Sequence, residues 1–427
     1  MATIGSLGDL HPTLALALGL QARGHRVTVV STEYYRERVT ALGIGFHPLR
    51  PNWNPTDQAL IAQCEDLKSG PEVLFRNLIL PHLPDTYADL LAAATGADLM
   101  IAGELVFAAP LVAEKLQLPW VSEILSPTSF FSAHDPSFLV NIPAVYKLRN
   151  AGWALNRAIL SFGKLVSRHW WQPVRRLRRE QGLRVACDPV FKDKFSPYLV
   201  LALFSSCLAQ PQPDWPSETQ QPGFVFYDGQ SAAEPANLNA FLASGDSPMV
   251  FTLGSTAVHH PGNFYEASSR AAQMLGRRAV LVGASAESIA PWHHALSTPY
   301  APYSQIFPRA AVIVHQGGSG TTGQAMRAGR PQLIVPFGWD QPDNGLRVER
   351  LGAGLCLARS EYSAETAAAA LRRLLEDPSF ANRAAETGAR VRAEDALEQS
   401  CQAIEQVLSA TSGALRTDRS APNGGRQ

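Results

Sequence analysis

The sequence predicts an α/β protein built from two parallel-sheet domains that face each other across a cleft. Short apolar runs alternate with helical stretches from end to end, as expected for strands joined by crossover helices. A chain of 427 residues is also long for one hydrophobic core. Between the two halves lies a segment, 209–246, that is rich in Pro, Gln, Ser, Asp and Gly, and its prolines exclude a continuous helix.

The two halves show the same alternation, each with its own set of elements. In the first predicted domain, 1–208, the candidate strands are 27–30, 99–102, 120–122 and 199–203, and the candidate helices are 14–22, 71–94 and 110–115. After the predicted linker, 209–246, the second domain, 247–408, contains strands 250–253, 279–282, 312–314 and 333–335 and helices 264–275 and 364–376, the latter capped by Ser363. The small, polar segment 409–427 is predicted to be disordered.

The first strand of the first domain has little room. Only three residues precede Gly5 once Met1 is discounted, whereas a strand of this fold usually has about 5 residues. Either the true start lies upstream or this strand is unusually short.

Composition excludes several classes of function. Lys plus Arg and Asp plus Glu number 37 each, so the net charge does not indicate nucleic-acid binding. The five cysteines are scattered without a C-x-x-C pair, which favours free thiols in a reducing cytoplasm. No apolar run reaches the roughly 18 to 20 residues that span a bilayer. We therefore expect a cytoplasmic protein, soluble or peripheral to a membrane.

The segment that begins at His315 and ends at Gln341 is the most informative part of the sequence. It contains a strand, a glycine-rich turn over 317–320, a helix that opens near Thr321, a second buried strand and a loop that closes with Asp340 and Gln341. Glycines let main-chain N–H groups approach an anion, and a helix N-terminus adds its positive dipole end. Close packing of helix and strand would also explain the glycines, but it does not explain His315 or the Asp340–Gln341 pair.

A second motif, Gly5-Ser-Leu-Gly-Asp9 followed by Pro12, lies at the N-terminus. Together the two motifs resemble those of the family 1 nucleotide-sugar glycosyltransferases, which include sterol, macrolide, glycopeptide and plant natural-product transferases. The resemblance implies the GT-B architecture, with two Rossmann-like domains, and a hexosyltransferase activity. It also implies that the donor is a dTDP- or UDP-sugar and that no other cofactor is needed.

The resemblance assigns the donor site to the second domain. His315 would contact the diphosphate, and Gly317, Gly318, Ser319, Gly320 and Thr321 would surround it with N–H and hydroxyl donors. Ser255 would face the phosphates from the other side, or be a simple turn residue. Asp340 and Gln341 would bind the sugar hydroxyls, and Tyr303 would lie near the nucleobase.

Two further features of the predicted donor site bear on its ligands. Plant members of the family carry a Glu that grips the ribose at the position of Gly323. Its absence is compatible with a dTDP donor, although bacterial UDP users often lack it too. No Asp-x-Asp sequence is present, so we predict that no metal ion holds the diphosphate.

Asp9 is the candidate general base, since the family carries its base at this position. An inverting transfer requires that the acceptor hydroxyl lose its proton as it attacks the anomeric carbon. An aspartate can do this at neutral pH only if burial raises its pKa. The alternative is that Asp9 only caps a helix that Pro12 begins. His11 is the rival base, and Glu104 is expected to orient or tune the base, or to be a solvated loop acid.

Several stretches, 126–134, 212–216, 223–229 and 250–256, are similar to the rhamnosyltransferases of rhamnolipid synthesis. This similarity favours a dTDP-deoxyhexose such as dTDP-L-rhamnose and a hydrophobic acceptor, such as a lipid, hydroxy fatty acid, sterol or polyketide. Ser6, His11, Phe107 and Phe130 are predicted on the acceptor side. Alternatives are a UDP-glucose-dependent glucosyltransferase of a secondary metabolite, an epimerase or cell-wall transferase of the same fold, and a non-catalytic partner protein.

The region 138–171 and the residues after it combine basic side chains with tryptophans. Such a surface suits contact with anionic membrane lipids, and the alternative is a solvated helix face over core tryptophans. The sequence does not indicate an oligomeric state.

Overall fold

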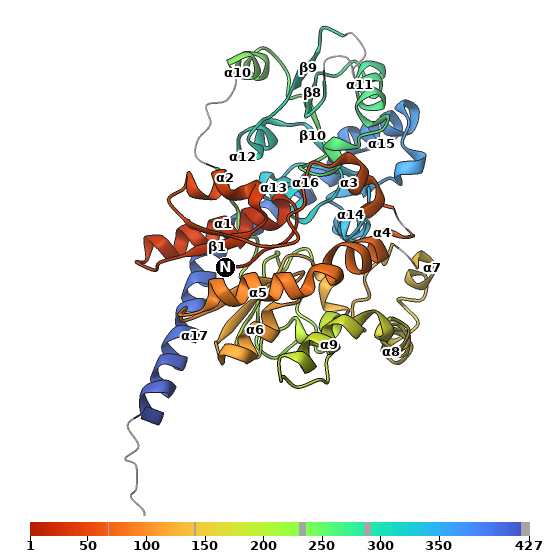
Figure 1. Cartoon of the computed structure of the whole chain (residues 1–427). Helices are drawn as coiled ribbons and strands as arrows, with labels where there is room; N and C mark the ends of the chain where they lie inside the picture. The colour runs from red at the N-terminus through yellow and green to blue at the C-terminus, as the bar shows by residue number, and fades with distance from the viewer. Residues whose placement is uncertain (67, 141, 230–235, 286–291, 420–427) are drawn as a thin grey trace, which may run out of the picture.

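The computed structural model describes residues 1–66, 68–140, 142–229, 236–285 and 292–419. It confirms the predicted fold class: two parallel sheets with helices on their faces form two stacked units (Figure 1). Most predicted strands are present within one or two residues, and 279–282 coincides with β8 (Ala279–Val282).

The first unit contains six described strands, all parallel: β1 (Thr28–Ser31), β2 (Gly45–Pro48), β3 (Met100–Gly103), β4 (Trp120–Ile124), β5 (Val200–Ala202) and β6 (Thr219–Gln220). Its described α-helices are α1 (Leu7–Ala22), α2 (Arg36–Thr40), α3 (Gln58–Cys64), α4 (Gly70–Glu72), α5 (Leu83–Ala94), α6 (Ala109–Leu116), α7 (Pro143–Tyr146), α8 (Trp153–Ser167) and α9 (Gln172–Glu180). Between α4 and α5 the backbone stays helical through a π-helix and a 3-10 turn.

Ala2 acts as the first strand of this sheet. It bridges Val30 of β1 on one side and Ala102 of β3 on the other. The order of strands is therefore β2-β1-Ala2-β3-β4-β5-β6, and it changes direction between Ala2 and β3. At such a switch point the loops after the two central strands diverge and leave a crevice. These loops carry Asp9 and Glu104.

The second unit contains β7 (Met249–Thr252), β8, β9 (Ala295–Thr298), β10 (Val312–His315), β11 (Gln332–Ile334) and β12 (Gly354–Cys356). Its described helices are α10 (Ala236–Ala243), α11 (Phe264–Met274), α12 (Tyr303–Ile306), α13 (Ser319–Ala328), α14 (Gln341–Arg350), α15 (Ala364–Glu376) and α16 (Pro378–Ala393). The parallel order β12-β11-β10-β7-β8-β9 reverses between β10 and β7. The loops after these two strands carry the predicted phosphate-binding residues, which places them at this sheet's switch point.

The last helix, α17 (Ala396–Arg419), returns to the first unit with its first part, and its C-terminal end projects away from the body of the molecule (Figure 1). Arg23, at the C-terminal end of α1, pairs with Glu398 and Glu405, and Cys401 and Ile404 belong to the apolar cluster that packs on α1. Gly19 allows the close approach, because a side chain there would meet Cys401.

Three predicted boundaries need correction. The predicted linker is not free of sheet structure, because β6 pairs with β5. The predicted second domain does not stay apart from the first, since α17 packs on α1. The segment predicted to be disordered from 409 continues α17 to Arg419, and 420–427 lie outside the described residues. The first two corrections concern tertiary contacts, which local composition does not report.

None of the helices in the described part of the protein is long and apolar enough to cross a membrane.

Candidate active site

Asp9 lies at the start of α1 and helps to begin it. Ser6 is the N-cap: its hydroxyl accepts from Gly8 N at 3.1 Å, and Asp9 Oδ2 accepts from Ser6 N at 2.8 Å. This capping box starts the helix before Pro12, so the expectation that Pro12 begins it was wrong. Gly5, at φ +144°, leaves the space that the Asp9 carboxylate fills, since a Cβ there would lie 2.1 Å from Oδ2. Asp9 therefore caps the helix and also lies at the crevice.

The carboxyl of Asp9 is poised near neutrality. Burial raises its pKa to about 7, and the negative charges of Glu104 and Asp340 contribute to the rise. Glu104 comes from the same domain, whereas Asp340 comes from the other. Both forms of Asp9 are thus populated at neutral pH, which is the condition for an effective general base.

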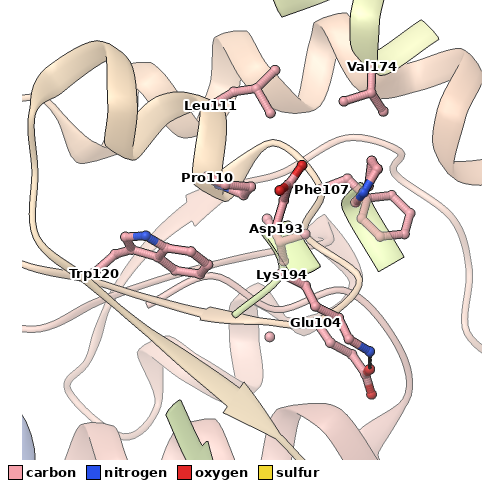
Figure 2. A pocket seen from close by; sticks show the side chains of 11 residues that line it. Glu104, Phe107, Pro110, Leu111, Trp120, Val174, Asp193 and Lys194 are labelled. Carbon is pink, nitrogen blue, oxygen red and sulfur yellow. Dashed lines mark hydrogen bonds and ion pairs between the residues drawn. The ribbon is translucent and has the colours of Figure 1, made fainter. Parts of the chain in front are cut away.

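Glu104 lies between two partners of the first domain. Its Oε1 accepts from the Ser129 hydroxyl at 2.7 Å, and its Oε2 pairs with the buried Lys194 ammonium at 2.9 Å. The pair closes one end of a narrow cavity that Phe107, Trp120 and other apolar side chains line (Figure 2). Glu104 is therefore a held, ion-paired carboxylate, not the solvated loop acid of the alternative interpretation.

Glu123 is an acid that sequence reasoning missed. It lies in β4, is 2% exposed, and accepts from the Thr13 hydroxyl at 3.0 Å, while its other oxygen has no hydrogen-bond partner among the described residues. Burial raises its pKa to about 7, and the charge of Asp9 adds to the rise. A glutamate inside the apolar strand 120–124 was the available signal.

His11 faces away from this group of acids. Its ring lies 5.1 Å from that of Tyr227, and burial, with a smaller contribution from Arg38, lowers its pKa to about 4. Residues two apart at a helix start point in different directions, and the structure shows this for Asp9 and His11. The arrangement favours Asp9 over His11 as the base.

The two predicted acceptor-side phenylalanines differ. Phe107 lines the cavity beside Glu104 (Figure 2), although it is largely buried against Trp171 and Phe75. Phe130 is stacked on Trp215 with ring centroids 4.0 Å apart, in an apolar cluster that includes Met326 and Ile334 of the second domain. Phe130 is therefore a packing residue between the domains, and its place on the acceptor side stays a prediction.

His315 ends β10 and is fully buried. Its Nδ1 accepts from Gly317 N at 3.0 Å, and its Nε2 lies 2.9 Å from Gln332 Oε1, which assigns the Nε2–H tautomer. Burial lowers its pKa to about 4, so the ring is neutral. Nδ1 thus supports the glycine turn and Nε2 contacts β11, and direct contact with a diphosphate stays a prediction.

The turn after His315 places main-chain N–H groups at the start of α13. Gly317 has φ +93°, and a side chain there would collide with Ile334 and the Gln341 carbonyl. The helix begins at Ser319, two residues before the predicted Thr321. Gly318 caps it, Gly320 faces open space and Thr321 is buried. The N–H groups of its first turn have no partner within the helix, so they are available to an anion.

Ser255 and Tyr303 lie on the side of this turn where β7, the strand beside β10, ends. Ser255 follows the Gly254 turn after β7, and the Tyr303 hydroxyl is 2.8 Å from Thr252 Oγ1 at the end of β7. Between the two loops lies Gln316, which sequence reasoning missed: it is 7% exposed, and its Oε1 has no hydrogen-bond partner among the described residues. Side chains at Gly254 or Gly318 would each meet its amide nitrogen. Gln316 therefore spaces the two loops.

Asp340 is the N-cap residue of α14, and Gln341 is the first residue of this helix. Burial raises the pKa of Asp340 to about 6, although the Asn344 amide donates to its Oδ2 at 2.8 Å. Gln341 Oε1 accepts from Phe337 N at 2.7 Å and from Gly338 N at 3.1 Å, which shapes the loop. No hydrogen bond within the described residues engages its Nε2, so this group remains available to a ligand.

Contacts from α13 and α14 hold the two domains together. The Ser319 hydroxyl donates to the Leu125 carbonyl. Asp343, fully buried, accepts from Phe138 N at 2.7 Å and pairs with Arg347 at 2.7 Å. Arg347 also pairs with Asp135 of the first domain. The sequence offered no signal for this network, because its partners lie more than 200 residues apart.

Position 323 faces the first domain's side of the helix and has no room for a side chain. A Cβ at Gly323 would lie 2.8 Å from the Phe224 ring. The Phe224 ring thus occupies the space beside Gly323. Among the described residues, no group of three His, Cys, Asp or Glu side chains is arranged to hold a metal ion.

The fold and this site define a glycosyltransferase of the GT-B class, and known proteins support the assignment. A model of the glycosyltransferase family 28 N-terminal domain matches residues 1–130. A model of the erythromycin biosynthesis protein CIII-like C-terminal domain matches residues 295–410. Both predicted motifs fall inside the matched segments.

The relatives identify the family. O-mycaminosyltylonolide 6-deoxyallosyltransferase from Streptomyces fradiae is 32% identical over 95% of this chain and 96% of its own length. A sterol 3-beta-glucosyltransferase from Aspergillus clavatus is 27% identical over 95% of this chain, which spans 29% of that longer protein. The chain belongs to the family of nucleotide-sugar glycosyltransferases that contains these macrolide and sterol enzymes.

Solved structures agree with the fold. The glycosyltransferase of kitacinnamycin superposes with a TM-score of 0.70 at 22% identity, covering 95% of this chain and 97% of that one. The spinosyn rhamnosyltransferase superposes with a TM-score of 0.66 at 19% identity, covering 95% and 99%. The GT-B architecture expected from the resemblance is therefore confirmed.

Proposed function

We propose that this enzyme is an inverting, metal-independent glycosyltransferase that moves a hexose or deoxyhexose from a dTDP- or UDP-sugar to a hydroxyl of a hydrophobic acceptor. The observation that carries the proposal is the approach of Asp9, on the first domain, to Asp340, on the second. A base for the acceptor and a carboxylate for the sugar thus come from different domains and are close enough to interact electrostatically.

In the proposed reaction Asp9 takes the proton of the acceptor hydroxyl as that oxygen bonds to the anomeric carbon. The bond from the anomeric carbon to the diphosphate oxygen breaks on the opposite face, so the configuration inverts. The N–H groups at the start of α13 and the dipole of that helix stabilise the departing diphosphate. Asp340 and the free amide of Gln341 orient the sugar.

Rhamnose or a related deoxyhexose on dTDP is the favoured donor. The Streptomyces fradiae relative is named for transfer of a deoxyhexose, and one solved neighbour is described as a complex with thymidine diphosphate. UDP-glucose is the alternative, and the sterol glucosyltransferase relatives favour it.

The acceptor is proposed to be hydrophobic and to enter from the first domain. Phe107 and Trp120 of that domain line a cavity beside Glu104 (Figure 2) that has room for about one water molecule, so the acceptor is proposed to bind outside this cavity. We place the reaction in the cytoplasm, in keeping with five cysteines that are all free.

The test is a panel of dTDP- and UDP-sugars assayed with sterol, hydroxy fatty acid and macrolide acceptors, in buffer with and without a chelator. We expect turnover with at least one deoxyhexose donor, unchanged by the chelator, and a product of inverted anomeric configuration by NMR. Loss of activity in the chelator would overturn the metal-independent mechanism. Retention of configuration would exclude direct attack assisted by Asp9.

A further inference from the structure

Helix α8 (Trp153–Ser167) turns its apolar side chains toward solvent. Phe162 and Leu165 are each 66% exposed, Val166 is 54% exposed and Leu155 is 42% exposed. Positions 155, 162 and 166 fall on one face at helical spacing, and 165 lies beside them. We call these four side chains the α8 stripe. An amphipathic helix in a folded domain normally buries such a face.

The opposite face of α8 holds the helix in place. Asn156, the one buried residue of α8, donates from its Nδ2 to the Ala133 carbonyl at 3.2 Å and to the Arg149 carbonyl at 3.0 Å. The Trp153 ring lies 5.8 Å from that of His134. Asn156 therefore anchors the inward face of α8, while the α8 stripe and the charged residues Arg157 and Lys164 lie on its exposed sides.

The sequence around the stripe is strongly basic. Residues 143–186 contain ten cations, Lys147, Arg149, Arg157, Lys164, Arg168, Arg175, Arg176, Arg178, Arg179 and Arg184, and a single acid, Glu180. Some are engaged, since Lys164 pairs with Asp188 and Arg178 with Glu114. Others, such as Arg157 and Arg179, are exposed. An apolar face bordered by cations matches a surface that is apolar inside and anionic at its boundary.

We propose that the α8 stripe and its basic border dock this enzyme on the surface of an anionic phospholipid membrane. The same charge disfavours a second copy as the occupant, because a symmetric contact would bring the exposed cations of α8, such as Arg157, close to those of the other copy. The helix lies in the interface and does not cross the bilayer.

The surface is joined to the active site through one loop. Ala133, which Asn156 holds, follows Ser129, whose hydroxyl binds Glu104. The same loop continues to Asp135, which pairs with Arg347 of the second domain. Figure 1 shows α7 and α8 together at one edge of the molecule. The purpose of membrane docking rests on the proposed function. Docking would bring the enzyme to its acceptor, because a hydrophobic acceptor concentrates in the membrane that α8 would contact.

The test is sedimentation of the full-length protein with vesicles of phosphatidylcholine alone or with phosphatidylglycerol. We expect binding to the anionic vesicles only, weakened by high salt. The variant Phe162→Ser/Leu165→Ser/Val166→Ser and, separately, Arg157→Glu/Arg179→Glu should each reduce the partition coefficient by about ten-fold or more. Matched controls are Met274→Ser and Arg270→Glu, which change exposed side chains of α11 in the second domain.

Activity on a short, water-soluble acceptor separates this proposal from the proposed function. Stripe variants that keep that activity and the wild-type melting temperature but no longer bind vesicles would support membrane docking. Wild-type protein that is active but does not bind anionic vesicles would overturn it. A concentration-dependent dimer, measured by light scattering and abolished by the stripe variants, would also overturn membrane docking. If no donor and acceptor react but vesicles bind, the proposed function fails and the docking surface stands.

Discussion

Burial raises the pKa of Asp9, on the first domain, and the charge of Asp340, on the second domain, adds to the rise after that of Glu104. The two carboxyls lie about 330 positions apart in the sequence, and only the closure of the two domains on each other lets one affect the other. The pKa of the proposed base therefore depends on whether Asp340, a predicted donor-binding residue, is charged.

Replacing Asp9 by Asn should lower kcat by about 100 to 10,000-fold, the usual contribution of a positioned base. The amide keeps most of the shape but cannot accept the proton, so calorimetric titration should find nucleotide binding unchanged. Asp377→Asn, at the cap of α16, is the matched control and should leave kcat unaltered. A wild-type rate for Asp9→Asn would remove Asp9 as the base.

The pH profile should report the environment of Asp9. Its pKa is about 7, and a base works only when deprotonated, so kcat/KM should rise with pH through that value. Asp340→Asn or Glu104→Gln removes a negative neighbour, which lowers the pKa of Asp9 and moves the acid limb to lower pH. The measured quantity is the pH at the midpoint of the acid limb, because either substitution also changes the maximum value of kcat/KM. A limb that moves upward would contradict the proposed coupling.

Glu123→Gln should stabilise the protein at alkaline pH. Burial raises the folded pKa of Glu123 to about 7, above its unfolded value, so the stability that its protonated form contributes is lost as pH rises through 7. Gln can still accept from Thr13 and carries no charge. Urea unfolding should show a gain on the order of 1–3 kcal/mol at pH 8 and little change at pH 5. An equal effect at both pH values would refute the linkage.

Removing Arg347 should destabilise the junction of the domains. Arg347 is 2% exposed and Asp343 is fully buried, so Arg347→Ala leaves a buried carboxylate without its cation. The loss should be about 3–5 kcal/mol in the free energy of unfolding. Arg350→Ala, one turn further along and largely exposed, should cost less than about 1 kcal/mol. Similar losses for both variants would show that the buried pair is not special.

Gly317 and Gly320 should respond differently to the same change. Gly317→Ala places a Cβ 2.7 Å from Ile334 in a left-handed backbone, whereas a Cβ at Gly320 meets open space. Thermal unfolding should show a cost on the order of 1–3 kcal/mol for Gly317→Ala and little or none for Gly320→Ala. Equal melting temperatures for the two variants would mean that the turn relaxes.

Local patterns predicted much of this protein. The alternation of apolar runs with helical stretches predicted the two parallel sheets, because strand and helix periodicities are local properties. The glycine turn after His315 and the Gly5–Asp9 segment predicted where ligands bind, since only certain residues tolerate those turns. The patterns could not show that α17 returns to the first domain or that Phe130 is a core residue, because both depend on which distant surfaces meet.

Sequence alone thus determined the class of fold, the family resemblance and the residues that deserve testing, Asp9 and Asp340 among them. Only the tertiary structure decided which acids share one crevice, that His11 turns away toward Tyr227, and that Glu123 and Asp343 are buried. Burial and electrostatic coupling are properties of neighbours in space. For residues separated by a hundred positions or more, domain packing creates those neighbours.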